Sequence, residues 1–78
     1  MTANDLLKEA VFEVGNLTSG EIFIVRDLFK GYLWNREMRN DRLKVGILFL
    51  NEATAGSLNG VIEVLDKTTA HQQKYRKI

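Results

Sequence analysis

The stretch EIFIVRDLFKGYLWNREMRNDRLKVGILFLNEATA, from Glu21 to Ala55, decides the fold of the chain. Its β-branched beginning, Ile22 to Val25, predicts a short strand. Apolar side chains then recur at helical spacing and predict a short helix. A polar connection, Asn35 to Asp41, leads to a longer helix, about Asp41 to Ala55. Two helices joined at an angle by a short connection are how small domains present one helix to a nucleic acid or to a protein groove.

The helix predicted over Asp41 to Ala55 is the most apolar element. Its expected buried face consists of Leu43, Gly46, Ile47, Phe49, Leu50 and Ala53. Gly46 predicts a close approach of another backbone. The expected outer face consists of Asp41, Lys44, Leu48, Asn51, Glu52 and Ala55. This outer face carries one cation and two acids, so it differs from the arginine-rich helix that reads a major groove.

Trp34 is the only tryptophan, and it falls where the preceding helix is expected to end, near Leu33 or Trp34. A large aromatic ring dominates the core of so small a domain, so a structural role at the core edge is favoured over a role in a binding site. Asn40 or Asp41 is expected to cap the next helix.

The first helix is predicted over Ala3 to Val14, with Thr2 as its cap, Asp5 completing a capping box and Gly15 as a left-handed stop. The expected buried stripe consists of Ala3, Leu6, Leu7, Ala10, Val11 and Val14. Phe12 falls on the polar side. We expect a loop to cover its ring or the helix to end early, and the alternative is contact with a partner subunit.

The C-terminal part predicts a β-hairpin after a loop bounded by Gly56 and Gly60. Val61 to Leu65 is expected as one strand, Asp66 to His71 as the turn, and Gln72 to Ile78 as a polar second strand. Tyr75 is the residue of that last strand expected to point inward.

Length and composition predict one domain over residues 1–78. The chain has no cysteine, which excludes a disulfide framework and a thiolate zinc site and favours a cytoplasmic setting. The longest apolar run, Ile47 to Leu50, is far shorter than the roughly 20 residues of a membrane span. Acids interrupt the N-terminal stretch, so no signal peptide is expected there. From the short apolar runs and the interrupted N-terminal stretch we expect a soluble protein.

Charge is distributed unevenly, although the net charge is only +1. The first helix is acidic, and from Arg26 onward there are ten Lys or Arg residues against six acids. The positive potential therefore belongs to the later elements.

The order of elements carries a first resemblance, and the pattern Phe23-x-Val25-x-Asp27-Leu28-Phe29, then Trp34, then Gly46-x-x-Phe49, carries a second. The chain resembles a winged helix-turn-helix domain, a mainly α fold with a small β-hairpin, over nearly its whole length. It is also similar to a family of small uncharacterised proteins of Gram-positive bacteria and their mobile elements. The winged-helix resemblance implies that the third helix is the recognition helix and that Lys67 to Lys77 is the wing.

Catalysis is not expected. His71 is the only histidine and lies in a predicted turn, where a solvated polar role is favoured. No phosphate-binding Gly-rich motif is present, and neither a cofactor nor a metal is expected.

Two functions of different classes remain. In the first, the protein binds double-stranded DNA through Arg36, Arg39, Arg42, Lys44, Asn51, Lys67, Lys74, Arg76 and Lys77. In the second, the domain binds another protein or a second copy of itself through exposed Phe12 and Leu48. The DNA-binding hypothesis is favoured. The alternative explanation of the cations is that they are ordinary solvated charges on the surface.

Overall fold

The computed structural model describes all of residues 1–78. Its elements are α1 (Ala3–Val14), β1 (Ile22–Phe23), the 3₁₀ helix η1 (Val25–Leu28), α2 (Gly31–Arg36), α3 (Arg39–Ala55), β2 (Ile62–Lys67) and β3 (Gln73–Lys77). The predicted order of one helix, a short strand, two helices and a closing hairpin is present. The fold therefore consists of three α-helices and a three-stranded antiparallel sheet.

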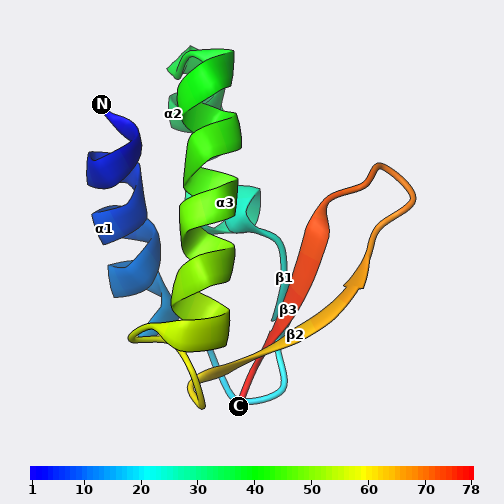
Figure 1. The fold of residues 1–78 in the computed structure, drawn as a ribbon. Helices are drawn as coiled ribbons and strands as arrows, with labels where there is room; N and C mark the ends of the chain where they lie inside the picture. Colours follow the sequence, from blue (N-terminus) through cyan, green and yellow to red (C-terminus); the bar gives the residue numbers. More distant parts are fainter.

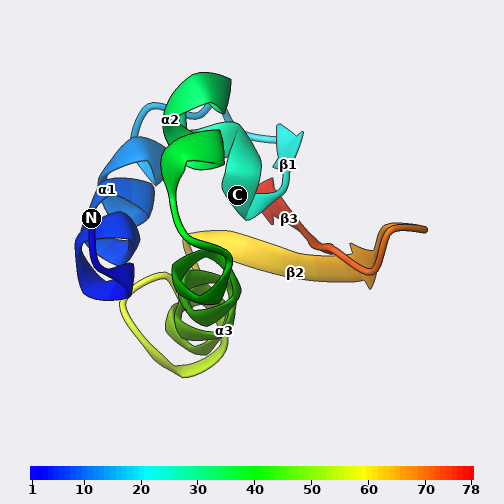
Figure 2. The same ribbon diagram turned by 90° about the horizontal axis from the view of Figure 1, so that it is seen from above.

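The sheet has the strand order β1-β3-β2, so the last strand of the chain lies in its centre. α1 and α3 lie side by side, and buried residues of both share one core with the sheet (Figure 1). The β2–β3 hairpin diverges from α3, and its tip stands away from the body of the molecule in both views (Figure 2).

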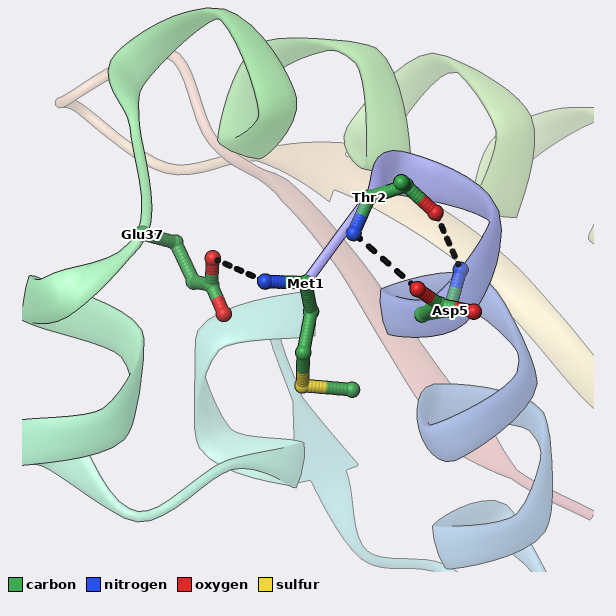
Figure 3. Close-up of polar contacts among 4 residues, drawn as sticks. All are labelled: Met1, Thr2, Asp5 and Glu37. Carbon is green, nitrogen blue, oxygen red and sulfur yellow. Dashed lines mark hydrogen bonds and ion pairs between the residues drawn. The ribbon is translucent and has the colours of Figure 1, made fainter.

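α1 begins and ends where the sequence predicts. The Thr2 hydroxyl accepts a hydrogen bond from the Asp5 N–H at 3.2 Å, and the Asp5 carboxylate accepts one from the Thr2 N–H at 3.1 Å (Figure 3). These hydrogen bonds satisfy free donors of the first turn and hold the pKa of Asp5 below its ordinary value. The Met1 ammonium lies 3.3 Å from the Glu37 carboxylate and links this end to the α2–α3 connection.

The apolar stripe of α1 is confirmed, because Ala3, Leu6, Ala10 and Val14 are buried and Leu7 and Val11 are half-buried. The predicted left-handed stop at Gly15 is wrong. Gly15 has φ −63° and ψ −19°, and its N–H donates to the Phe12 carbonyl at 3.1 Å. The last turn tightens into a 3₁₀-type bond, which needs no positive φ.

The segment predicted as one strand and one helix is divided differently. β1 is only two residues long, because the Asp27 carboxylate accepts a hydrogen bond from the Ile24 N–H at 3.0 Å and turns the chain into η1. Phe29 then has an extended backbone and separates η1 from α2. α2 begins at Gly31 and ends at Arg36, beyond the predicted end.

Three aromatic rings from β1, α3 and β3 form the centre of the core. The Phe49 and Tyr75 ring centroids are 5.0 Å apart in an edge-to-face contact, and Phe23 stacks on Tyr75 at 5.6 Å. Phe23 and Phe49 meet edge-on at 6.3 Å. Tyr75 is fully buried, which confirms its predicted inward direction. Aromatic pairs in these geometries add to the free energy gained from area burial.

The buried face of α3 is rotated from the predicted one. Its fully or nearly fully buried residues are Val45, Phe49 and Ala53. Leu43 and Ile47, both expected in the core, are 57% and 64% exposed. Leu48, expected outside, is half-buried. The cause is tertiary: α3 packs against both α1 and β2, so the face between these two contacts is the buried one.

Two smaller predictions for α3 are also wrong. The helix begins at Arg39 after Met38, whose side chain makes no capping hydrogen bond, so the expected caps Asn40 and Asp41 lie inside the first turn. No heavy atom lies within 4 Å of a Cβ built on Gly46. Gly46 therefore makes no close contact with another backbone, and the space beside it on the surface of α3 is open.

β2 and β3 confirm the predicted hairpin with boundaries shifted by one or two residues. Val64 pairs with Tyr75, whereas Lys67 pairs with Gln73, so β2 holds one extra residue between them. Such a bulge increases the local twist. The tip is closed by the Thr68 N–H, which donates to the Gln72 carbonyl at 2.7 Å. His71 occupies the left-handed region at φ 63°.

Candidate functional site

A groove of about 470 Å³ lies between α3 and the β2–β3 hairpin, on the flank of α3 away from α1. We call it the α3–hairpin groove. Its apolar lining comes from the η1 region, α2 and α3, and consists of Ile24, Val25, Trp34, Leu43, Ile47 and Leu50. Leu43 and Ile47, which the sequence assigned to the core, thus border the groove. Trp34 is half-buried, stacks on Phe29 at 5.2 Å and forms part of the groove wall.

The charged residues that line the α3–hairpin groove are all cationic. Arg39 and Arg42 come from the first turns of α3, Lys67 from the end of β2, and Arg26 from η1. No Asp or Glu lines the groove, although the chain has ten of them. The groove therefore combines an apolar wall with positive potential, which suits a ligand that carries negative charge.

Two polar atoms in the groove lining lack a partner within the protein. They are Arg42 Nε and the Tyr75 hydroxyl, the only buried side-chain nitrogen or oxygen atoms without a hydrogen bond. Burial also raises the pKa of Tyr75 to about 12, so the hydroxyl stays protonated at neutral pH. Buried polar groups in proteins are nearly always hydrogen-bonded, so both atoms need an explanation.

The outer face of α3 differs from the predicted one in charge. Its exposed residues Asn40, Lys44, Ile47 and Asn51 recur at helical spacing and include no acid. Asp41 and Glu52, which the sequence placed on this face, are half-buried on the flank of Leu48. Ser57 donates from its hydroxyl and its N–H to the Glu52 carboxylate, at 2.7 and 2.9 Å, and lowers the pKa of Glu52.

The remaining predicted cations do not gather at one place. The Arg36 guanidinium lies over the Tyr32 ring, 5.1 Å from its centroid. Side chains alternate along β3, so Lys74 and Arg76 lie on the face of the sheet opposite Tyr75. Arg76 forms an ion pair with Glu63, and Lys77 is half-buried near the far end of β3. The structure thus brings Arg39, Arg42 and Lys67 together and separates Lys74, Arg76 and Lys77 from them.

The two predicted partner contacts have different environments. The ring of Phe12 is 72% exposed, so the expectation that a loop covers it is wrong. On the helix surface it is surrounded by Asp5, Lys8 and Glu9. Leu48 is half-buried on α3, so it is not an exposed apolar contact. The two residues therefore do not form one apolar surface.

His71 lies exposed in the hairpin turn, as predicted, beside the α3–hairpin groove. No group of three or more His, Asp or Glu side chains is arranged to hold a metal ion. None of the helices has the length and apolar character needed to cross a membrane. What the groove offers chemically is a binding surface made of guanidinium, ammonium and apolar groups.

A family model described as "Domain of unknown function (DUF1413)" matches residues 8–77. The chain belongs to this family. Neither the comparison with curated proteins nor the comparison with solved structures gives a match. Membership agrees with the resemblance to small uncharacterised proteins, and the DUF1413 description states no activity. The function of this DUF1413 domain therefore has to be inferred from its surface.

The sequence predicts only Arg39, Arg42 and Lys67 among the residues that line the groove in this DUF1413 domain, and three of the others are informative. From the sequence, Arg26 contributes only to the count of positive charges, and Leu43 and Ile47 are predicted to be buried in the core. A signal was present: Val45 and Leu48 had no place on the predicted buried face, although both are large and apolar. A second apolar side on the same helix indicates that it serves two contacts rather than one.

Proposed function

We propose that the protein is a non-catalytic DNA-binding domain of the winged helix-turn-helix kind, with α3 as the recognition helix and the β2–β3 hairpin as the wing. The order of elements and the sheet order β1-β3-β2 support this proposal. So does the hairpin tip, which stands away from the body of the molecule on the side of α3 opposite α1 (Figure 1). Fold alone carries no function, so the proposal depends on the surface of α3.

The observation that carries the proposal is the acid-free outer face of α3. Lys44 supplies a cation there, and the exposed amides Asn40 and Asn51 can donate to and accept from base edges. Exposed Ile47 can contact a thymine methyl group. Asp41 and Glu52, whose predicted place on the outer face argued against base recognition by this helix, lie on its half-buried flank instead.

Cations beside this face suit phosphate contacts. Arg39 lies at the start of α3 and Lys67 at the base of the hairpin tip, and neither forms an ion pair within the protein. Both can therefore release counterions from a duplex without first breaking an internal salt bridge. Arg42 lies with them in the lining of the α3–hairpin groove, whereas Arg36, Lys74, Arg76 and Lys77 lie apart from this cluster and would have to contact phosphates elsewhere on the duplex.

Fluorescence anisotropy with a labelled duplex, measured at several salt concentrations, tests the proposal. We expect affinity to fall steeply as salt rises, because each phosphate contact contributes a slope of about 0.9 in log affinity against log salt. The variants Arg39→Gln and Lys67→Gln should each make the slope shallower by up to about 0.9. Lys8→Gln, which removes the same charge from α1, is the matched control and should leave the slope unchanged.

Base reading is tested separately from phosphate contact. The double variant Lys44→Gln/Asn51→Ala should change the preference among duplex sequences, because its side chains lie on the face proposed to enter the groove. The triple variant Lys74→Gln/Arg76→Gln/Lys77→Gln should weaken binding equally for all sequences, with a slope change of at most about 2.7. Absence of duplex binding by the wild type at low salt would refute the DNA proposal.

One observation favours a second candidate function, self-association through α1. A phenylalanine that is 72% exposed is unusual on a monomer surface, and Phe12 is the most exposed large apolar residue of the chain. If α1 is a subunit contact, the mass in solution should exceed that of one chain, and Phe12→Ser should return it to the monomer. A wild-type protein that stays monomeric at high concentration would exclude this function.

A further inference from the structure

We propose that the α3–hairpin groove binds a small organic anion with an apolar body, such as a medium-chain carboxylate. The groove volume of about 470 Å³ lies within the range of roughly 300–1,000 Å³ typical of small-molecule sites. Its wall is apolar along Trp34, Ile47 and Leu50, and every charged residue in the lining is a cation. An anion alone would not use the apolar wall, and a neutral apolar molecule would not use the cations.

Arg42 supplies the most specific part of the site. Its side chain is half-buried in the lining, and it forms neither an ion pair nor a hydrogen bond with a carboxylate of the chain. Buried polar atoms in proteins are nearly always hydrogen-bonded, and Arg42 Nε is such an atom. Its Nε–H is shielded from bulk solvent and has no acceptor within the protein, so it is free to donate to an acceptor that enters the groove. A carboxylate fits a guanidinium in the two-point geometry that makes such pairs strong.

The Tyr75 hydroxyl reinforces the same conclusion. It is the second unpartnered buried polar atom, and it belongs to the lining of the same groove. The neutral hydroxyl and the Arg42 Nε–H both offer a proton to an acceptor. Two donors without acceptors, in a lining with three further cations and no acid, call for a ligand headgroup rich in acceptor oxygens.

Gly46 explains how the groove stays open. Glycine in the interior of a helix is less stable than alanine, and no packing contact in this fold requires it here. Gly46 lines the groove, and a Cβ at this position would project into open space. The absence of a side chain thus preserves room for the body of a ligand along α3.

Trp34 provides a direct reading of occupancy, because it is the only tryptophan and lies in the groove wall. Tryptophan emission is followed while the protein is titrated with decanoate below its micelle threshold, and calorimetry gives the stoichiometry. Decanol and decylamine are titrated in parallel because they share the chain and differ in the headgroup. We expect saturable binding of one decanoate per chain, with decanol weaker by about tenfold or more because it lacks a charge-assisted hydrogen bond.

Two glycine variants separate the groove from the rest of the surface. Gly46→Leu should fill the groove and abolish the decanoate response, while thermal unfolding confirms that the variant folds. Gly31→Leu is the matched control, since this helical glycine also has no atom within 4 Å of an added Cβ but does not line the groove. It should bind decanoate like the wild type. Arg42→Gln should reduce the decanoate response to the level of decanol.

The proposal is overturned if decanoate gives no saturable response, if decanol or decylamine binds as tightly as decanoate, or if Gly46→Leu binds it like the wild type. All titrations are made without DNA. A failure of DNA binding would therefore leave this inference intact, and a failure here would leave the DNA proposal intact.

Discussion

α1 and α3 lie side by side, yet the sequence predicts the orientation of one and not of the other. In α1 the apolar residues apart from Phe12 form one stripe, and that stripe is buried. In α3 apolar residues occur around most of the helix, and two separate sides are used. Val45 and Phe49 face the core, whereas Leu43 and Ile47 border the α3–hairpin groove.

The difference shows what an apolar pattern can determine. A one-sided pattern fixes both the existence of a helix and its rotation about its axis. When apolar residues occur around most of a helix, the pattern predicts that the helix forms but not how it is rotated about its axis, because several rotations bury similar amounts of apolar area. The packing of α1 and β2 against α3 then selects among them.

The largest expected effect concerns the core side of α3. Phe49→Ala should lower the free energy of unfolding by about 3–5 kcal/mol, because Phe49 is fully buried and contacts both Phe23 and Tyr75. Chemical denaturation of wild type and variant measures the difference. A loss below about 1 kcal/mol would mean that the core side of α3 is not the one described.

Tyr75, against which Phe49 packs, makes that core sensitive to alkali. Its folded pKa of about 12 is raised above the ordinary value of 10.0, so its contribution is complete below pH 10 and is lost as the pH rises through 12. The expected loss is about 2–3 kcal/mol. Unfolding measured between pH 9 and about 12 should show this decline in the wild type. Tyr75→Phe should show a smaller decline, and equal declines would contradict the assignment.

Neighbouring residues on α3 give the sharpest test of its rotation. Leu48→Ala should cost about 1 kcal/mol because Leu48 is half-buried, whereas Ile47→Ala should change stability by less than about 0.5 kcal/mol because Ile47 is 64% exposed. The sequence alone predicts the reverse order. Thermal unfolding of the two variants side by side decides between the two rotations.

The two helices also differ at their N-termini. Thr2→Ala should destabilise the protein by about 1 kcal/mol through loss of the capping box of α1. α3 has no side-chain cap, but Asp41 stands three residues after Met38, as Asp5 does after Thr2. Met38→Thr should therefore stabilise the protein by about 0.5–1 kcal/mol. If both variants unfold at the wild-type temperature, the helix ends contribute less than the capping geometry indicates.

The smallest expected effect is a gain. Gly46→Ala should raise stability by about 0.5–1 kcal/mol, because alanine favours the helix and its methyl group meets no neighbouring atom. Circular dichroism during heating measures it. Destabilisation would show that a backbone approaches Gly46 after all, as the sequence first suggested.

Local signals in the sequence were enough for elements whose partners are close in the chain. The Thr2–Asp5 capping box, the α1 stripe and the hairpin with inward Tyr75 all depend on neighbouring residues. The α3–hairpin groove could not be predicted in this way, because it joins Arg26, Arg42 and Lys67 from three separate elements. The early end of β1 is also not predicted, since it depends on one hydrogen bond that the Ile24 N–H donates to the Asp27 carboxylate.

The central position of β3 has a consequence for how the chain reaches this structure. β1 pairs only with β3, and Ile22 lies opposite Arg76, a separation of 54 residues (76 minus 22). Closing so long a loop costs chain entropy before the pairing returns any free energy. Tyr75 belongs to the same late segment, so the aromatic centre of the core is incomplete until that segment arrives. The three helices can form early from local contacts, but only the final strand locks them to the sheet.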